Sequence, residues 1–88
     1  MITKTYTILS PEGIHARPAT ALVKLARQYE SDISMRKNGK QVKLDSLLNI
    51  LALGLKGGDK IDIVAEGSDE TQAAGAIDQF FNEQLKHL

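Results

Sequence analysis

The spacing of the hydrophobic residues changes repeatedly along this chain, and that change constrains the fold more than any other feature. Over residues 2–9 apolar and polar side chains alternate, with Ile2, Tyr6 and Ile8 on one side, which is typical of a half-buried strand. From Ala16 the apolar residues recur at helical spacing, which indicates an amphipathic helix. The expected elements are a strand over 2–9, a helix over 16–30, strands over 33–36 and 41–44, a helix over 46–53, a strand over 60–66 and a final helix after Ser68.

Turn-forming residues separate these segments. Asn38 and Gly39 both tolerate a positive φ, so they predict a hairpin between the two short strands. Gly54 is expected to end the second helix, and Ser68 is expected to cap the last one. The order βαββαβα predicts an α+β open-faced sandwich, in which three helices cover one face of a four-stranded antiparallel sheet. The length, residues 1–88, suits one small domain.

The apolar stripes of the first and last helices define the expected core. In the first helix Leu25 and Tyr29 widen the stripe. The residues expected to contribute are Ala19, Leu22, Val23, Leu25, Ala26, Tyr29, Ala73, Ala74, Ile77, Phe80, Phe81 and Leu85.

Composition excludes several classes of function. Eleven basic residues balance eleven acidic ones, so no overall charge draws the chain to nucleic acid or to a membrane. There is no cysteine, and no His, Asp and Glu cluster has metal-ligand spacing, so neither a metal nor another cofactor is expected. The longest apolar run, 47–55, is too short to cross a bilayer, and no signal-peptide pattern opens the chain. A cytoplasmic protein is expected.

The segment 13–19 contains the residues best suited to chemistry. A glycine-bearing turn brings His15 to the expected start of a helix, where unpaired amides and the helix dipole favour a phosphate. Arg17 adds a guanidinium group whose planar donors match phosphate oxygens. A neutral imidazole is a nucleophile, so the group predicts a phosphoryl acceptor. The competing interpretation is that His15 is an ordinary surface or capping residue.

Two further features suggest a surface that binds other proteins. Thr20, Lys24 and Arg27 follow Arg17 at helical spacing and form a polar, basic stripe, which suits an acidic partner but also an ordinary solvated helix face. The second helix has apolar residues on every side, although one face of a sheet cannot bury them all. Some of these residues are expected to form an exposed apolar patch; burial of the whole helix is the equally weighted alternative.

Ser46 opens the second helix and is most simply an N-cap, with Asp45 as a competitor for that role. Phosphorylation at the same position would be favoured by the helix dipole. It would also place two negative charges beside the apolar patch. Ser46 is therefore a candidate for a regulatory switch.

The segment 13–19, Gly-Ile-His-Ala-Arg-Pro-Ala, resembles the active-site sequence of HPr, the phosphocarrier family of the bacterial phosphoenolpyruvate-dependent sugar phosphotransferase system. The resemblance covers essentially all of the chain. It includes Val42-Lys43-Leu44 before Ser46, the pair Leu53-Gly54, and the segment 65–70 before the last helix.

The resemblance implies a carrier rather than a turnover enzyme. His15 would take a phosphoryl group on its ring Nδ1 from phosphorylated enzyme I and pass it to the IIA unit of a sugar permease, and Arg17 would bind the phosphate. The positions that resemble the partner-docking face of the family are Thr20, Lys24, Arg27, Leu47, Leu48 and Leu51. A monomer is expected.

The resemblance also implies a regulatory role for Ser46, which matches the residue phosphorylated by HPr kinase/phosphorylase in Gram-positive relatives. In those relatives the phosphoserine form lowers sugar transport and binds a catabolite-control regulator. The relatives typically read Lys-Ser-Ile-Met-Gly at this point, whereas this chain has Asp45 before the serine and Asn49 in place of the glycine.

Three other functions are alternatives. A regulatory paralogue that acts by protein binding would lack the active-site histidine, so His15 speaks against it. A specialised phosphorelay would use the same residues. A nucleic-acid-binding module on a similar sandwich needs aromatic side chains on its sheet, and the four present, Tyr6, Tyr29, Phe80 and Phe81, do not suit that arrangement.

Overall fold

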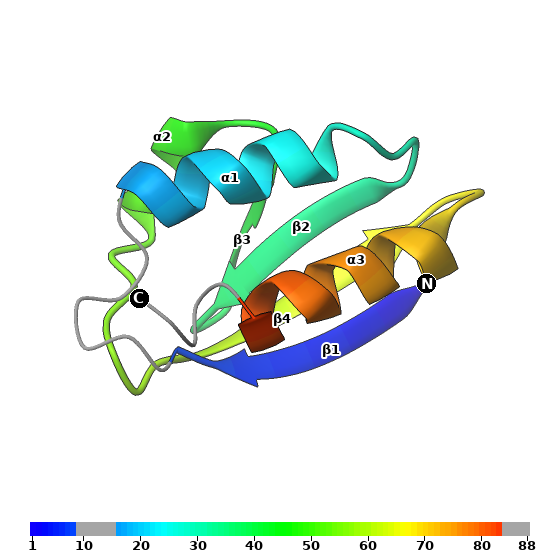
Figure 1. The fold of residues 1–88 in the computed structure, drawn as a ribbon. Helices are drawn as coiled ribbons and strands as arrows, with labels where there is room; N and C mark the ends of the chain where they lie inside the picture. The colour runs from blue at the N-terminus through cyan, green and yellow to red at the C-terminus, as the bar shows by residue number, and fades with distance from the viewer. Residues whose placement is uncertain (9–15, 84–88) are drawn as a thin grey trace.

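The computed structural model describes residues 1–8 and 16–83, without the side chains of 16–18 and 83. The elements follow the order βαββαβα (Figure 1). Their bounds are β1 Ile2–Thr7, α1 Ala16–Ala26, β2 Asp32–Lys37, β3 Lys40–Lys43, α2 Leu47–Ala52, β4 Lys60–Glu66 and α3 Glu70–Glu83.

The four strands form one antiparallel sheet in the order β1-β4-β2-β3. The first strand therefore lies beside the last one, with Ile2 opposite Ala65 and Tyr6 opposite Ile61. The β2–β3 hairpin turns at Asn38 and Gly39, whose φ angles are 52° and 81°, as the Asn-Gly pair predicts.

The three helices lie on one face of the sheet, as predicted, and the core fills the layer between them (Figure 1). Alternate residues of β4 supply the sheet side: Ile61, Ile63 and Ala65 are buried, whereas their neighbours are not. All predicted core residues of α3 up to Phe81 are buried; Leu85 lies outside the described residues. The apolar stripe of α1 is confirmed by the buried residues Ala19, Leu22, Val23 and Ala26.

A ring stack and a hydrogen bond join β1 to α3. The rings of Tyr6 and Phe81 stack with centroids 4.5 Å apart, and the Tyr6 hydroxyl donates to Asp78 Oδ1 over 2.8 Å. Burial, together with the bond to Asp78, raises the pKa of Tyr6 above its ordinary value. The edge strand is thus attached both to its neighbour in the sheet and to the helix above it.

The first helix is shorter than predicted: it ends at Ala26, whereas the sequence pattern predicts an end near Glu30. After Ala26 the amides of Gln28 and Tyr29 donate to carbonyls three residues back, which tightens the chain into a turn. The next amides, those of Glu30 and Ser31, donate to the carboxylate of Asp69, over 2.8 and 2.9 Å. The helical pattern continues to Tyr29, but a distant side chain takes the amides that would extend the helix.

The predicted cap at Ser68 is wrong. Helix α3 begins at Glu70, and the Ser68 hydroxyl donates to a Glu30 carboxylate oxygen over 3.2 Å instead. Asp69, directly before the helix, also accepts a hydrogen bond from the Ser31 hydroxyl. The connection between β4 and α3 is therefore bound to the connection between α1 and β2. These donors, with the Ser31 hydroxyl foremost, lower the pKa of Asp69.

We expect this junction to lose stability in acid. Because the folded protein lowers the pKa of Asp69 below 3.8, the unfolded chain binds the proton more readily. The contribution is complete above the unfolded pKa and is lost as the pH falls through the folded one. The melting temperature should therefore drop between about pH 5 and about pH 2, and Asp69→Asn should make this drop smaller. Asp32→Asn, which changes an exposed aspartate, is the control. An equal drop in Asp69→Asn and in the wild type would contradict the assignment.

Candidate functional site

The sequence-predicted site is only partly within the described residues. Helix α1 begins at Ala16, so His15 directly precedes the helix in the chain. His15 itself and the side chain of Arg17 lie outside the described residues. The predicted start of the helix at Ala16 is confirmed.

The predicted basic stripe runs along α1 and ends at Arg27, the residue directly after the helix. Lys24 and Arg27 are exposed, and Thr20 is half-buried. The Arg27 guanidinium donates to the backbone carbonyl of Asp45 over 2.7 Å. This bond links the end of α1 to the residue before Ser46, so it brings the basic stripe next to the start of α2.

Ser46 caps α2, as predicted. Its backbone is extended, with φ −140° and ψ 124°, and its hydroxyl oxygen accepts a hydrogen bond from the Asn49 amide over 3.4 Å. Asp45, the competing candidate, is exposed and supplies only its backbone carbonyl, to Arg27. The half-buried Ser46 side chain lies at the N-terminal end of α2, and the first turn of this helix contains no acidic residue.

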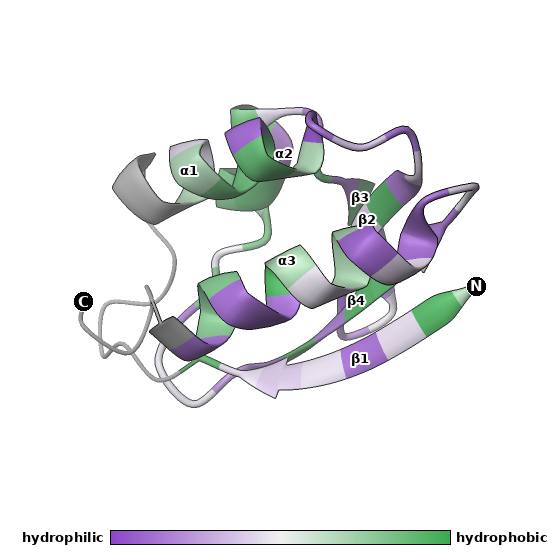
Figure 2. Ribbon diagram, turned by 45° about the vertical axis from the view of Figure 1, so that its right-hand side comes forward, coloured by the Kyte–Doolittle hydropathy of each residue, from purple (hydrophilic) through white to green (hydrophobic). Residues whose placement is uncertain are grey.

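The apolar helix α2 combines the two interpretations that the sequence left open. Ile50 is fully buried and Leu47 packs partly against the core. In contrast, the exposed fraction is 77% for Leu48 and 37% for Leu51. Helix α2 lies beside α1 over the same face of the sheet (Figures 1 and 2). The leucines of α2 that were expected to dock partners therefore fall into two groups. Leu47 packs partly against the core, whereas Leu48 and Leu51 form the exposed apolar patch.

A lysine and an aspartate that the sequence analysis did not single out lie at the other end of α2. The Lys37 ammonium donates to the backbone carbonyls of Leu53 and Gly54 over 3.4 and 3.1 Å, and lies 2.8 Å from Asp59 Oδ2. Only the Gly-Gly-Asp turn at 57–59 marks this place in the sequence, and it gives no sign of the pairing.

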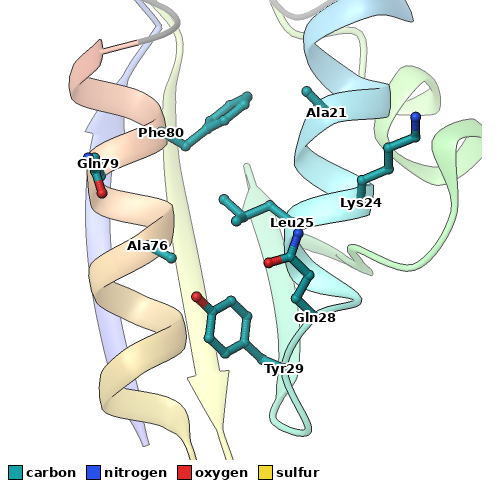
Figure 3. Close-up of a pocket in the computed structure, with 8 residues that line it drawn as sticks. All are labelled: Ala21, Lys24, Leu25, Gln28, Tyr29, Ala76, Gln79 and Phe80. Carbon is teal, nitrogen blue, oxygen red and sulfur yellow. The ribbon is translucent and has the colours of Figure 1, made fainter.

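A groove of about 520 Å³ separates α1 from α3 (Figure 3). Leu25 and Phe80 line it from the two helices, and Tyr29 and Gln28 line its other end. Lys24 is at its edge and points away from α3. The groove is thus on the opposite flank of α1 from the exposed patch on α2.

In residues 1–8 and 16–83 no group of three His, Asp or Glu side chains is arranged to hold a metal ion. Within the same ranges, no helix has the length and apolar character needed to cross a membrane.

Comparison with known proteins identifies the family. The family model described as the PTS HPr component phosphorylation site matches residues 2–83. The chain belongs to the HPr family, and this membership supports a phosphocarrier role in the phosphotransferase system. The resemblance seen in the sequence is confirmed.

Solved structures of the family superpose over nearly the whole chain. The histidine-containing phosphocarrier protein of Mycoplasma is 37% identical, with a TM-score of 0.92, and the match covers 96% of each chain. An HPr from Thermoanaerobacter tengcongensis is 32% identical with a TM-score of 0.91, covering 98% of this chain and 97% of that one. The predicted α+β sandwich is the fold of these proteins.

A regulatory relative is also similar. Crh, the catabolite repression protein of Bacillus subtilis, is 27% identical with a TM-score of 0.75, and the match covers 96% of this chain and 97% of that one. Crh was solved as an intertwined dimer with a swapped domain. Fold similarity alone does not separate a carrier from such a relative, so the separation depends on residues.

Proposed function

We propose that this chain is a phosphocarrier that accepts a phosphoryl group on His15 from enzyme I and passes it to IIA units of sugar permeases in the cytoplasm. The observation that most supports this role is the start of α1 at Ala16, directly after His15 in the chain. The first amides of a helix lack partners within it, and the aligned peptide dipoles leave that end partly positive. Such an end favours the dianionic phosphoryl group over bare imidazole.

The proposed transfer is a displacement at phosphorus. The lone pair of neutral His15 Nδ1 forms the P–N bond while the bond from phosphorus to the donor side chain breaks. Arg17 pairs with the phosphoryl oxygens. The second transfer reverses this chemistry, since the IIA side chain attacks phosphorus and His15 leaves as neutral imidazole. The chain then returns to its starting state, as a carrier requires.

The proposed docking face combines the basic stripe along α1, which ends at Arg27, with the exposed patch on α2. Lys24 and Arg27 suit an acidic partner surface, and Leu48 offers an apolar side chain that a partner can cover. The hydrogen bond from Arg27 to the Asp45 carbonyl keeps the two parts adjacent. Thr20, Leu47 and Leu51 complete the face.

Removing the Leu48 side chain should weaken docking without unfolding the protein. Burying an exposed leucine against a partner stabilises a complex by roughly 2 kcal/mol, so Leu48→Ala should raise the KM of enzyme I for this protein about tenfold or more. Steady-state phosphoryl transfer at varied carrier concentration measures this change. Gln72→Ala truncates an exposed residue of α3 and should leave KM unchanged. Equal KM values for both variants would exclude Leu48 from the docking face.

Ser46 is proposed as a site of regulatory phosphorylation by HPr kinase/phosphorylase, with a catabolite-control regulator as the partner of the modified form. A phosphate on Ser46 would lie at the N-terminal end of α2 and close to Arg27, which binds the neighbouring carbonyl. It would also add negative charge next to the exposed patch. This arrangement favours weaker docking of the phosphocarrier partners after modification.

We also propose that the carrier is a monomer. In this chain β1 pairs with β4 of the same molecule through six residue pairs, which supports a sheet completed within one copy. The swapped dimer of Crh is the alternative arrangement. A regulatory protein of that type is the second candidate function, and it would not need His15.

Labelling tests the proposal directly. Incubation with phosphoenolpyruvate and enzyme I should add the mass of one phosphoryl group, and the adduct should be lost in acid and stable in base, as expected of a phosphohistidine. Addition of a IIA protein should remove it. HPr kinase and ATP should add an acid-stable phosphate at Ser46 instead. Absence of the acid-labile adduct, with enzyme I shown to be active on another carrier, would refute the carrier role.

A further inference from the structure

The cluster around Lys37 joins three parts of the fold that are separate in the sequence. Lys37 is the last residue of β2, where the hairpin to β3 begins. Its ammonium reaches the backbone carbonyls of Leu53 and Gly54, which follow α2, and the carboxylate of Asp59, which precedes β4. An ammonium group has three N–H donors, and here three oxygens surround it.

Helix α2 needs such external support. It has six residues, and an isolated helix of that length is unstable in water. At its end Gly54 has a φ of 61°, and its amide donates to the Leu51 carbonyl over 3.1 Å. A lysine at a helix C-terminus binds the last carbonyls and interacts favourably with the dipole. Lys37 therefore supports the end of α2 opposite to the Ser46 cap.

Asp59 extends the cluster to the end of β1. Its carboxylate accepts a hydrogen bond from the Lys56 amide over 2.8 Å as well as the ion pair with Lys37. Its backbone carbonyl accepts from the Ile8 amide over 2.8 Å, and the Ile8 carbonyl accepts from the Gly58 amide over the same distance. Ile8 is the last described residue before the chain continues to His15.

The cluster is sheltered rather than fully solvated. The exposed fraction is 17% for the Lys37 side chain and 29% for Asp59. The bond from Lys37 is the foremost cause that lowers the pKa of the Asp59 carboxyl below 3.8, and the bond from the Lys56 amide adds to it. An exposed ion pair alone contributes little to stability. In this pair, however, Lys37 also binds the backbone carbonyls of Leu53 and Gly54, and Asp59 also binds the Lys56 amide. Its place in the fold therefore matters more than its charge alone.

We propose that Lys37 is a positioning residue for phosphoryl transfer, which with Asp59 fixes the C-terminal end of the docking helix α2 relative to Ile8, the residue directly after β1. Lys37 does not itself touch the phosphoryl group in this proposal. The proposal rests on the proposed function, because it needs α2 to bind the partner while His15 reacts. Partner binding and transfer then depend on a side chain in the β2–β3 hairpin.

The test compares two lysines of the same hairpin. Lys37→Met keeps most of the apolar stem and removes the ammonium, whereas Lys40→Met removes the same charge from an exposed side chain three residues away. Lys37→Met should raise the KM of enzyme I for this protein about tenfold, with kcat within about twofold, since a misplaced docking element weakens productive binding. Lys40→Met should leave both constants unchanged, and Lys37→Arg should recover most of the loss.

Hydrogen exchange supplies a readout that needs no partner. In Lys37→Met the amides of Leu53, Gly54 and Gly58 should exchange at least about tenfold faster than in Lys40→Met. Amides in the middle of β4, such as Ile63, should be unchanged and so report an intact sheet. Asp59→Asn should accelerate the same amides, and the double variant should show no further increase.

The outcomes separate this inference from the proposed function. Transfer by the wild type, with unchanged KM in Lys37→Met or unchanged exchange at the end of α2, would overturn the positioning role alone. A wild-type protein that accepts no phosphoryl group would overturn the proposed function, and with it the kinetic role of Lys37. If Lys37→Met does not fold, Asp59→Asn gives the same comparison against Lys40→Met.

Discussion

His15→Ala is expected to accept no phosphoryl group from enzyme I, which is the largest functional effect that any single substitution should have. The proposed covalent bond forms at the imidazole, so its removal takes away the acceptor itself and not one contribution to the rate. The chain has one other histidine, His87, and His87→Ala is a matched control that should be labelled at the wild-type rate. Intact-protein mass spectrometry after incubation with phosphoenolpyruvate and enzyme I measures both.

The result must be separated from unfolding. Thermal melts of His15→Ala and His87→Ala should differ little from the wild type, because neither substitution removes a described core residue. Acid-labile label in folded His15→Ala at the wild-type rate would show that another residue is the acceptor. Loss of label in His87→Ala alone would move the site to the other end of the chain.

Ile50→Ala is expected to cause a large loss of stability, about 2–5 kcal/mol in the free energy of unfolding. Ile50 is the one residue of α2 that is fully buried, and its truncation leaves a cavity beneath a helix that is too short to hold itself in place. The loss is a substantial part of the total stability of a typical small domain. Equilibrium unfolding in urea measures it.

Leu48→Ala is the matched comparison, since it truncates an apolar residue in the same helix. Its side chain is exposed, so the unfolding free energy should change by less than about 0.5 kcal/mol. The two variants should thus separate the roles of one helix, with stability lost in Ile50→Ala and partner binding lost in Leu48→Ala. Equal destabilisation by both would mean that the Leu48 side chain is covered in solution.

The elements with a clear hydrophobic period could be predicted from the sequence. The alternation in β4 and the helical stripe of α1 each have a local physical cause, and the structure confirms the strand bounds and the buried stripe. The end of α1 could not be predicted in this way. Asp69, more than 35 residues away, binds the amides of Glu30 and Ser31, and no local pattern reports such a contact.

The candidate site shows the same division. From motif and resemblance the sequence alone singled out His15, Arg17 and the docking residues as candidates, and it predicted that part of α2 would stay exposed. Which leucines are exposed depends on how α2 lies against α1 and the sheet, and only the structure distinguishes Leu48 from Ile50. The cluster of Lys37 and Asp59 is formed by a hairpin and a turn that are adjacent only after folding.

The strand order sets the sequence of events when a ribosome makes this protein. The β2–β3 hairpin is local and can form early, but β4 lies between β1 and β2 in the sheet. Residues 2–7 thus have no partner strand until residues 60–66 have been synthesised, by which point most of the chain has been made. Contacts of such large sequence separation slow folding. We therefore expect the nascent chain to stay incomplete, with an unpaired first strand, at least until β4 has been synthesised.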